Sequence, residues 1–286
     1  RHTRFRNVTG VQTCALPIFS NHARLHITVR GDELPPRLDA GEIEDAVAAV
    51  VATWSDNLRS LLLDSMATAR AMELLERHGA RFPLAYQSEV TPSEAMGDLE
   101  ALESLIATPD LPHLRLHRPT GSPKNIIHLR VARHSEALPI AELVPLLENF
   151  GLRMLAERPW TLFGIEGGLV VSLQDFSLEL RDGATLDVAR DGDRLLMALR
   201  LVRRGELESD GFNRLVLLAG LGAYEVNALR ACCRYLLQTG IPFSQSYMER
   251  TFAAHADLAA DLHALFEERL SPERTRNAGD KRLLAR

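Results

Sequence analysis

The fold is decided by the stretch IIHLRVARHSEALPIAELVPLLENFGLRMLAERPWTLF, which runs from Ile126 to Phe163. It begins with alternating apolar residues, continues with leucines at helical spacing from Pro139 to Asn149, and returns to a strand-like pattern after Gly151. These changes of period predict a strand, a helix and a second strand. Pro145 lies inside the helical segment, so we expect either a kink there or a helix start later than Pro139.

Further elements flank this stretch on both sides. Leu114–Arg118 before it and Leu169–Leu180 after it have strand-like patterns, and Asp187–Arg204 has a helical one. In Leu169–Leu180 the apolar positions change parity near Asp175, which predicts a β-bulge there. The order β-β-α-β-β-α predicts an α+β domain over residues 111–206, in which an antiparallel sheet has its helices on one face.

Residues 21–110 are expected to be the end of an upstream domain followed by a helical linker. Arg24–Arg30 alternates like a strand, and Asp39 with Glu42 marks a helix start. Apolar residues then recur every three or four positions and predict one buried helical face: Ile43, Val47, Val50, Trp54, Leu58 and Leu61.

Two more helix ends are marked in the linker. Gly79 is expected to end a helix in the left-handed conformation. Thr91, Pro92 and Glu94 supply an N-cap, an N1 proline and an N3 acid for the next helix.

Residues 207–271 are predicted to be wholly helical. Asp210 is a natural N-cap, and breaks are expected near Gly220–Gly222, Gly240–Pro242 and His255–Ala256. Connections this short imply antiparallel helical hairpins.

Composition excludes several classes of function. A net charge of −5 gives no reason to expect nucleic acid or an anionic membrane as a partner, and no apolar run reaches the ~18 residues of a membrane span. Three cysteines are too few for a disulfide scaffold, so we expect a cytoplasmic protein. Lys124 and Lys281 are the only lysines, which limits any mechanism that needs a lysine base.

Both ends of the chain are expected to lie outside any domain. The run VTGVQTCALPI, Val8 to Ile18, resembles a translated sequencing adaptor, although the basic and apolar residues there also fit a transit or signal peptide superficially. We therefore expect residues 1–20 to be artefactual and disordered. Residues 272–286 are polar and aperiodic and are expected to form a disordered tail.

A Gly-x-Gly sequence at Gly220–Gly222 imitates a dinucleotide-binding turn, because an apolar run precedes it and a helix follows it. The third glycine of that fingerprint is replaced by Glu225, whose charge would oppose a pyrophosphate. The apolar run begins at the capping residue Asp210, so a helix is the better interpretation. We predict no nucleotide site here.

Histidines and cysteines give no specific site. His113 and His117 stand four apart, as in some zinc sites, but without a clear third ligand they are interpreted as structural or solvated. His255 and His263 need no ligand to explain them. Of Cys232 and Cys233, one is expected to pack in the core. We therefore predict no catalytic, cofactor-binding or metal-binding residue.

Several longer stretches stand in one order and spacing along the chain: LPIAELVPLLENFGLRMLAERPW (Leu138 to Trp160), QDFSLE (Gln174 to Glu179), ESDGFNRLVLLAGL (Glu208 to Leu221), LRACCRYLLQTGIPFSQSYMERTFAAH (Leu229 to His255) and LFEERLSP (Leu265 to Pro272). Together they resemble the large bacterial NAD-specific glutamate dehydrogenases over about residues 137–272. Residues 24–108 fit the upstream linker of that family more loosely.

The resemblance implies an oxidoreductase family that converts L-glutamate, NAD and water to 2-oxoglutarate, ammonia and NADH. It implies that this chain is a fragment upstream of the catalytic domain, with an ACT-like domain and helical segments, inactive alone and without its own NAD. Expected partners are the enzyme's own catalytic domain, other subunits of a homo-oligomer and a possible small-molecule effector. The alternative is a stand-alone amino-acid-binding ACT-like module with a helical adaptor.

Overall fold

The computed structural model describes residues 39–164, 168, 170–181 and 183–270, together with the short strands β1 (Val11–Thr13) and β2 (Leu25–Ile27), which pair antiparallel. The strand expected within Arg24–Arg30 is confirmed as β2. Apart from β1, the disorder expected for residues 1–20 and 272–286 lies outside the described residues. The chain divides into two compact units, residues 1–53 and residues 54–286, and each is described by itself.

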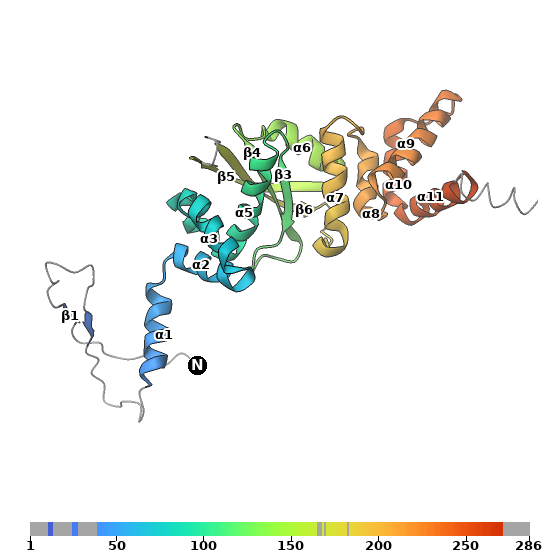
Figure 1. The fold of residues 1–286 in the computed structure, drawn as a ribbon. Coiled ribbons are helices and arrows are strands. Elements are labelled where there is room, and N and C mark those ends of the chain that lie inside the picture. Colours follow the sequence, from blue (N-terminus) through green and yellow to red (C-terminus); the bar gives the residue numbers. More distant parts are fainter. Residues whose placement is uncertain are drawn as a thin grey trace, which may run out of the picture. The chain divides into compact units, whose positions relative to one another are not determined.

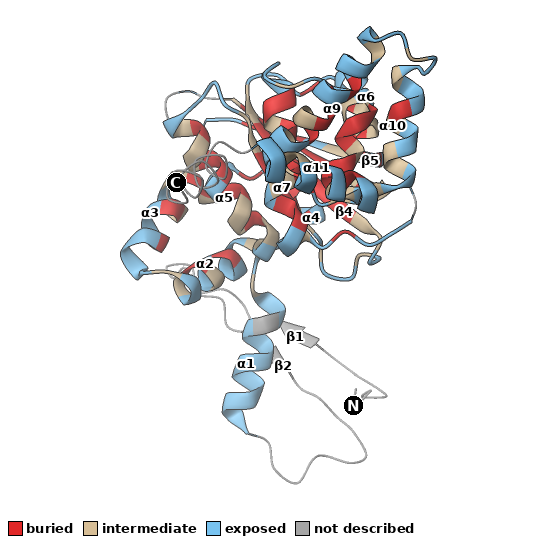
Figure 2. Cartoon of the chain, turned by 90° about the vertical axis from the view of Figure 1, so that its right-hand side faces the viewer, coloured by how far each residue is buried: buried red, intermediate tan, exposed pale blue. Residues whose placement is uncertain are grey.

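In the first unit, α1 (Ala40–Val51) starts where the sequence indicates, because the Asp39 carboxylate accepts a hydrogen bond from the Gly41 amide. The expectation that its apolar side is buried is wrong. Ile43, Val47 and Val50 are 46%, 47% and 85% exposed, and Figure 2 shows the helix as exposed. The helix also ends at Val51, so its apolar spacing does not continue into the next helix as one face.

The second unit begins with linker helices: α2 (Trp54–Ser65), α3 (Thr68–His78), the 3-10 turn η1 (Gly79–Arg81), α4 (Leu84–Glu89) and α5 (Pro92–Ala107). The start of α5 is a full capping box, in which Thr91 and Glu94 each accept from the other's amide. Gly79 does not end its helix in the left-handed conformation. Its φ is −56°, because the chain continues directly into η1.

The centre is a four-stranded antiparallel sheet in the order β3-β4-β6-β5. Its strands are β3 (His113–His117), β4 (Ile126–His134), β5 (Leu152–Leu162) and β6 (Val171–Leu180). Figure 1 shows this sheet between the linker helices and the C-terminal helices. The β-β-α-β-β-α order that the sequence predicts is confirmed.

One face of the sheet is covered by the two helices of that motif, α6 (Ile140–Asn149) and α7 (Val188–Arg203), as predicted. α6 starts at Ile140 and keeps Pro145 inside it, which settles the helix start that the sequence left open. Gly151 turns the chain into β5 with a φ of +80°. The core on this face includes side chains from every strand and both helices, such as Leu116, Phe176, Leu178, Leu147 and Leu199.

The opposite face is covered by the linker, which the sequence did not predict. Leu99, Leu102 and Leu105 of α5 form one buried cluster with Trp160, Leu162, Val171 and Leu173 of the sheet. Phe82 and Tyr86 stack in the same cluster, and Trp54 packs against both rings at a steep angle. The Trp54 indole donates to the Val90 carbonyl at 2.8 Å. The sheet is therefore buried on both faces.

Burial on both faces explains why the bulge expected near Asp175 is wrong. In β6 the residues of both parities are buried, since one parity packs against α5 and the other against α6 and α7. The register shift lies instead in the edge strand β5, between Met154 and Ala156. The extra residue reverses the parity of β5, so Arg158 and Trp160 point to the same face as Asp175.

After the sheet the chain is helical, as predicted: η3 (Gly211–Arg214), α8 (Leu215–Leu218), α9 (Ala223–Gln238), α10 (Gln245–Ala254) and α11 (Ala256–Leu270). The breaks fall at the three expected places. Phe212, Val226 and Met248 join these helices to the core beneath α6 and α7. In the part of the chain that is described, no helix is long and apolar enough to cross a bilayer.

Candidate functional site

The sheet face beneath α5 holds a group of polar and charged side chains beside the apolar cluster of that face. They come from α4, α5 and all four strands, and we call them the buried ionic cluster: Tyr86, Asp98, Arg115, His117, His128, Arg130, Arg158 and Asp175. The strand residues share one face because the registers place Arg115 opposite Arg130 and Arg130 opposite Asp175. The cluster thus joins the linker helices to the sheet.

Arg130 is the centre of the cluster and is only 3% exposed. Its Nη1 donates to Asp98 Oδ2 at 2.5 Å, and its Nε donates to Asp175 Oδ1 at 3.1 Å. The guanidinium also lies over the Trp160 ring, 5.0 Å from its centroid. One cation therefore bridges a carboxylate on α5 and a carboxylate on β6.

Each of the two carboxylates has further partners. Asp98 accepts from the Tyr86 hydroxyl at 2.5 Å and from Arg115 at 3.1 Å. Asp175 accepts from Arg158 at 3.1 Å, and its Oδ2 lies 2.7 Å from Nδ1 of His128. Each carboxylate thus has several hydrogen-bond donors, which a buried ion pair needs in order to offset the cost of removing its charges from water.

The environment fixes the protonation states of these groups. Burial, followed by the charge of Asp98, raises the pKa of Tyr86 far above its usual value. Burial opposes ionisation of Asp175, but the His128 hydrogen bond and Arg130 outweigh it and hold the pKa of this carboxyl below its usual range. For Arg130 the two carboxylates likewise outweigh burial and raise its pKa. Within the cluster, Asp175 is thus an ionised carboxylate, Arg130 a charged guanidinium and Tyr86 a neutral phenol.

His117, His128 and Asp175 are the one group of possible metal ligands among the described residues, with ligand atoms within 4.8 Å of one another. Both ring nitrogens of His117 are buried without a hydrogen-bond partner. However, both Asp175 oxygens already accept from guanidinium groups of Arg130 and Arg158. A divalent cation there would compete with two fixed positive charges, so the donor set does not fit a metal ion.

His117, which the sequence indicates to be a structural or solvated histidine, lies beside His128, with ring centroids 5.4 Å apart. Asp98, Arg130 and Asp175 were missed. A signal was present, because His128 and Arg130 occupy alternate positions among the apolar residues of the first part of β4 and so indicate a polar face.

A second buried ion pair lies in the C-terminal helices. The Asp210 carboxylate caps η3 through the Phe212 amide at 3.1 Å, as the sequence predicts. It also accepts from Nε and Nη2 of Arg230 at 2.7 and 2.9 Å, and Arg230 is 2% exposed. Asn213 accepts from the same guanidinium at 2.6 Å. The polar residues of this stretch therefore serve to hold η3 against α9.

At the Gly220–Gly222 turn, which imitates a dinucleotide-binding turn, the backbone is bound by the side chain of a nearby residue, Glu225. Glu225 accepts from the Gly222 amide at 2.9 Å and caps α9. A carboxylate thus sits at the helix N-terminus where a bound pyrophosphate would need free amides. Of the two cysteines in α9, Cys233 is buried and Cys232 exposed, as expected, and burial raises the pKa of the Cys233 thiol to about 11.

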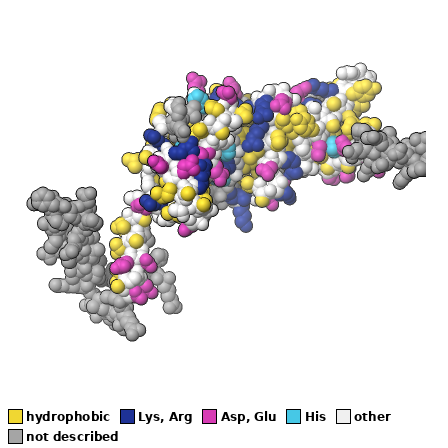
Figure 3. Space-filling model, viewed as in Figure 1, with side chains coloured by type: hydrophobic (Ala, Val, Ile, Leu, Met, Phe, Trp, Pro, Cys, Tyr) yellow, Lys and Arg dark blue, Asp and Glu magenta, His cyan; other side chains and the backbone are white. Residues whose placement is uncertain are grey.

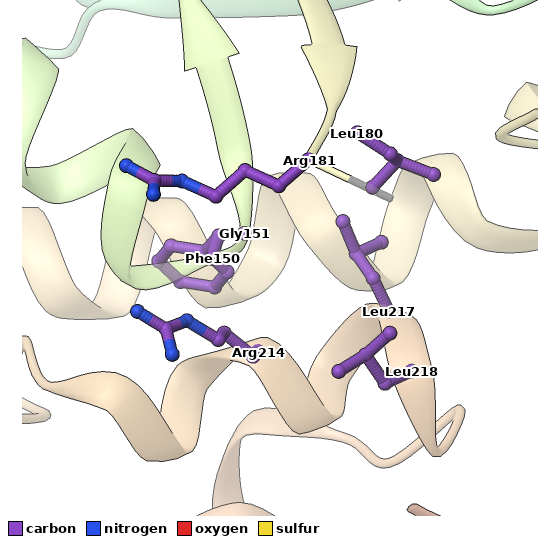
Figure 4. A pocket seen from close by; sticks show the side chains of 7 residues that line it. All are labelled: Phe150, Gly151, Leu180, Arg181, Arg214, Leu217 and Leu218. Atoms are coloured by element: carbon purple, nitrogen blue, oxygen red, sulfur yellow. The ribbon is translucent and has the colours of Figure 1, made fainter. Parts of the chain in front are cut away.

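A small pocket of about 210 Å³ lies between the end of α6, the end of β6 and α8. Figure 4 shows the Arg181 and Arg214 side chains on one side of it, beside Phe150, and leucines on the other. Arg181 pairs with Glu148 at 2.7 Å. The walls of this pocket are largely apolar, and the pocket lies at the contact between the sheet domain and the C-terminal helices.

Three family models match the chain in succession. Helical motif 2 of glutamate dehydrogenase matches residues 61–105, its ACT3 domain matches residues 112–190, and its helical motif 3 matches residues 207–272. The buried ionic cluster thus joins a residue of the first region, Asp98, to residues of the second, Arg130 and Asp175.

Curated relatives align over most of the chain. It is 30% identical over 243 residues to the NAD-specific glutamate dehydrogenase of Pseudomonas aeruginosa. This alignment covers 85% of the chain and 15% of that enzyme. The enzymes of Halomonas elongata and Mycobacterium tuberculosis are 27% and 28% identical over 90% and 91% of the chain. The chain spans 15% to 17% of the length of these relatives. Because three regions of one family follow each other in order and the relatives align over nearly all of it, the chain belongs to the large NAD-specific glutamate dehydrogenases.

Proposed function

We propose that this chain is a non-catalytic, regulatory and structural region of a larger NAD-dependent glutamate dehydrogenase. The whole enzyme would convert L-glutamate, NAD and water to 2-oxoglutarate, ammonia and NADH. The observation that supports this role most directly is the buried ionic cluster, which fastens helical motif 2 to the ACT3 sheet. Its carboxylates accept hydrogen bonds from guanidinium groups of the same cluster, as expected of a structural contact, and are not arranged around a substrate.

Two further observations support the absence of an NAD site in this chain. Glu225 caps the helix that follows Gly222, so its carboxylate would repel a phosphate there. The sequence also has only two lysines, Lys124 and Lys281, and Lys124 lies in a turn between β3 and β4. A deamination mechanism that depends on lysine side chains therefore has few candidate residues in this chain.

The partners that we propose are the catalytic domain of the same enzyme and further subunits of a homo-oligomer in the cytoplasm, where it would act in amino-acid catabolism. An apolar groove of about 560 Å³ between α9, α10 and α11 supports burial against another part of the protein, since apolar surface of this kind is costly in water. It is lined by side chains such as Leu236, Phe243, Phe252 and Leu265. Figure 3 shows hydrophobic side chains over part of this helical region, with further hydrophobic side chains among acidic and basic groups elsewhere on that face.

The proposal is tested with the purified chain by calorimetry with NAD and with L-glutamate, together with an assay for NADH formation. We expect no saturable NAD binding and no turnover. Micromolar NAD binding would refute the non-catalytic role. Saturable glutamate binding without NAD binding would instead favour the stand-alone amino-acid-binding module, and the neighbouring downstream DNA would then be expected to lack a coding region for a catalytic domain.

A further inference from the structure

A pocket of about 430 Å³ lies between the C-terminal end of α5, the start of β3, the end of β4 and the last turns of α7. Four arginines line it: Arg133, Arg200, Arg203 and Arg204. The only carboxylate side chain in its lining is that of Asp110. We call this cavity the arginine pocket. Its volume is within the range of pockets that hold small metabolites.

Three of the four arginines of the arginine pocket have no carboxylate partner within the described part of the chain. Arg133, Arg200 and Arg203 form no ion pair there, and Arg204 reaches Glu206 only at 3.6 Å. Arg200 donates to the Leu114 carbonyl at 3.4 Å. Arginines elsewhere in the second unit are commonly paired with carboxylates, for example Arg70, Arg77, Arg115, Arg130, Arg153, Arg158, Arg181, Arg190, Arg194, Arg230 and Arg234.

The groups in the pocket repel one another. Burial, and then the charge of Arg133, hold the pKa of the Arg203 guanidinium below its usual value, although the charge of Glu142 opposes this shift. Burial, followed by Arg200 and Arg115, likewise lowers the pKa of His113, which also lines the pocket. Arg133 and Arg200 are half-buried, whereas Arg203 and Arg204 are exposed. Water therefore screens the repulsion between these like charges only in part, and an anion bound among them would compensate it.

A purely structural explanation accounts for only part of this arrangement. Arg200 and Arg203 stand in the last turn of α7, where cations are favoured by the negative end of the helix dipole. Arg133 comes from β4 and gains nothing from that dipole, yet its side chain turns into the same cavity. Three elements that are far apart in sequence thus supply the polar lining.

We propose that the arginine pocket binds a small anion with at least two acidic oxygens, either a dicarboxylate or a phosphate. Guanidinium groups fit both, because the planar fork of an arginine can donate two parallel hydrogen bonds to a carboxylate or a phosphate. Leu111 and Leu114 provide an apolar wall against which the carbon skeleton of a dicarboxylate would pack. This binding site is independent of the proposed function, since it rests only on the geometry of this chain.

Calorimetry on the full chain tests the proposal with sodium succinate and with sodium phosphate, at an ionic strength held constant with sodium chloride. We expect saturable binding of at least one of them, and binding at least about tenfold weaker for the monoanion acetate. Arg133→Gln and Arg203→Gln should each raise Kd about tenfold or more. Tighter binding of succinate would identify a dicarboxylate ligand, and tighter binding of phosphate a phosphorylated one.

Arg59→Gln is the matched control, because Arg59 is an exposed arginine on α2 outside this pocket. It makes the same change of charge and should leave Kd within about twofold of the original chain. Circular dichroism of each variant shows whether it is folded before binding is compared. Failure of both anions to saturate below about 10 mM would overturn the proposal. Equal Kd values for the pocket variants and Arg59→Gln would overturn it as well.

Discussion

At the scale of single residues, Arg130 is the side chain on which most of the buried charge depends. Arg130→Met keeps the volume but leaves Asp98 and Asp175 without their shared cation. Removing one partner of a buried ion pair costs about 3–5 kcal/mol, because the remaining charges stay buried. We therefore expect urea unfolding to show a loss of stability of about 3–5 kcal/mol with an unchanged m value.

Arg153→Met provides the comparison. Arg153 pairs with Glu179 on the same sheet, but its side chain is 61% exposed. Water and salt screen such a pair, so its loss should cost less than about 1 kcal/mol. If the two variants were equally stable, the cluster would not be the joint between helical motif 2 and the ACT3 sheet.

His117 gives the cluster a dependence on pH. Burial, followed by the charge of Arg115, lowers its pKa to about 3, although Asp175 opposes this shift and Arg130 and His128 add to it. An unfolded histidine titrates near about 6.5, so below that pH the unfolded chain binds a proton that the folded chain does not. The stability associated with neutral His117 is therefore complete above about pH 6.5 and is lost as the pH falls toward 3, by at most about 1.4 kcal/mol per pH unit.

His117→Gln should flatten this slope, measured by urea unfolding at about pH 4.5, 5.5 and 6.5. Asp175 contributes little in that window, because its lowered pKa confines its own effect to more acidic solution. The exposed His255 gives the control His255→Gln, which should keep the original slope. An unchanged slope in His117→Gln would mean that His117 becomes protonated in the folded chain.

At the scale of elements, the start of η3 shows how a cap can do more than its sequence indicates. A capping aspartate alone contributes about 1 kcal/mol. Asp210 also holds the buried Arg230 guanidinium, so Asp210→Ala should cost about 3–5 kcal/mol. Asp187→Ala is the matched case, since Asp187 caps α7 through the amides of Ala189 and Arg190 and should cost only about 1 kcal/mol. Equal costs in chemical denaturation would show that the Arg230 contact adds nothing.

The elements themselves could be predicted where their signals are local. Thr91 and Glu94 fixed the start of α5, and Gly151 fixed the turn into β5, because a capping box and a positive φ depend on a few neighbouring residues. The bulge was assigned to the wrong strand because α5 buries the second face of β6, so that β6 carries apolar residues of both parities without a bulge. No local sequence pattern shows this packing of α5. Gly79 was misjudged for a similar reason, since the chain continues into η1 instead of reversing.

At the scale of the whole molecule, the site could not be assembled from the sequence because its partners are distant. Arg130 stands 32 residues from Asp98 and 45 from Asp175. Pairing of β4 with β6 brings Arg130 beside Asp175, and the docking of α5 on the sheet adds Asp98. A polar face on β4 was visible in His128 and Arg130, but the acids that neutralise it lie on other elements.

The division of the chain into residues 1–53 and 54–286 leads to the last prediction. Both buried clusters of the second unit consist of residues from Leu58 onward, while Ile43, Val47 and Val50 of α1 are exposed. Deleting residues 1–53 should therefore change the melting temperature by less than about 4 °C, which corresponds to about 1 kcal/mol for a domain of this size. Deleting residues 1–66 also removes Leu58 and Leu62 from the core and should lower the melting temperature by more than about 8 °C, since each buried leucine contributes about 2–5 kcal/mol. Circular dichroism melts of both truncations make the comparison, and a drop of more than about 5 °C for the shorter deletion would show that the first unit stabilises the second.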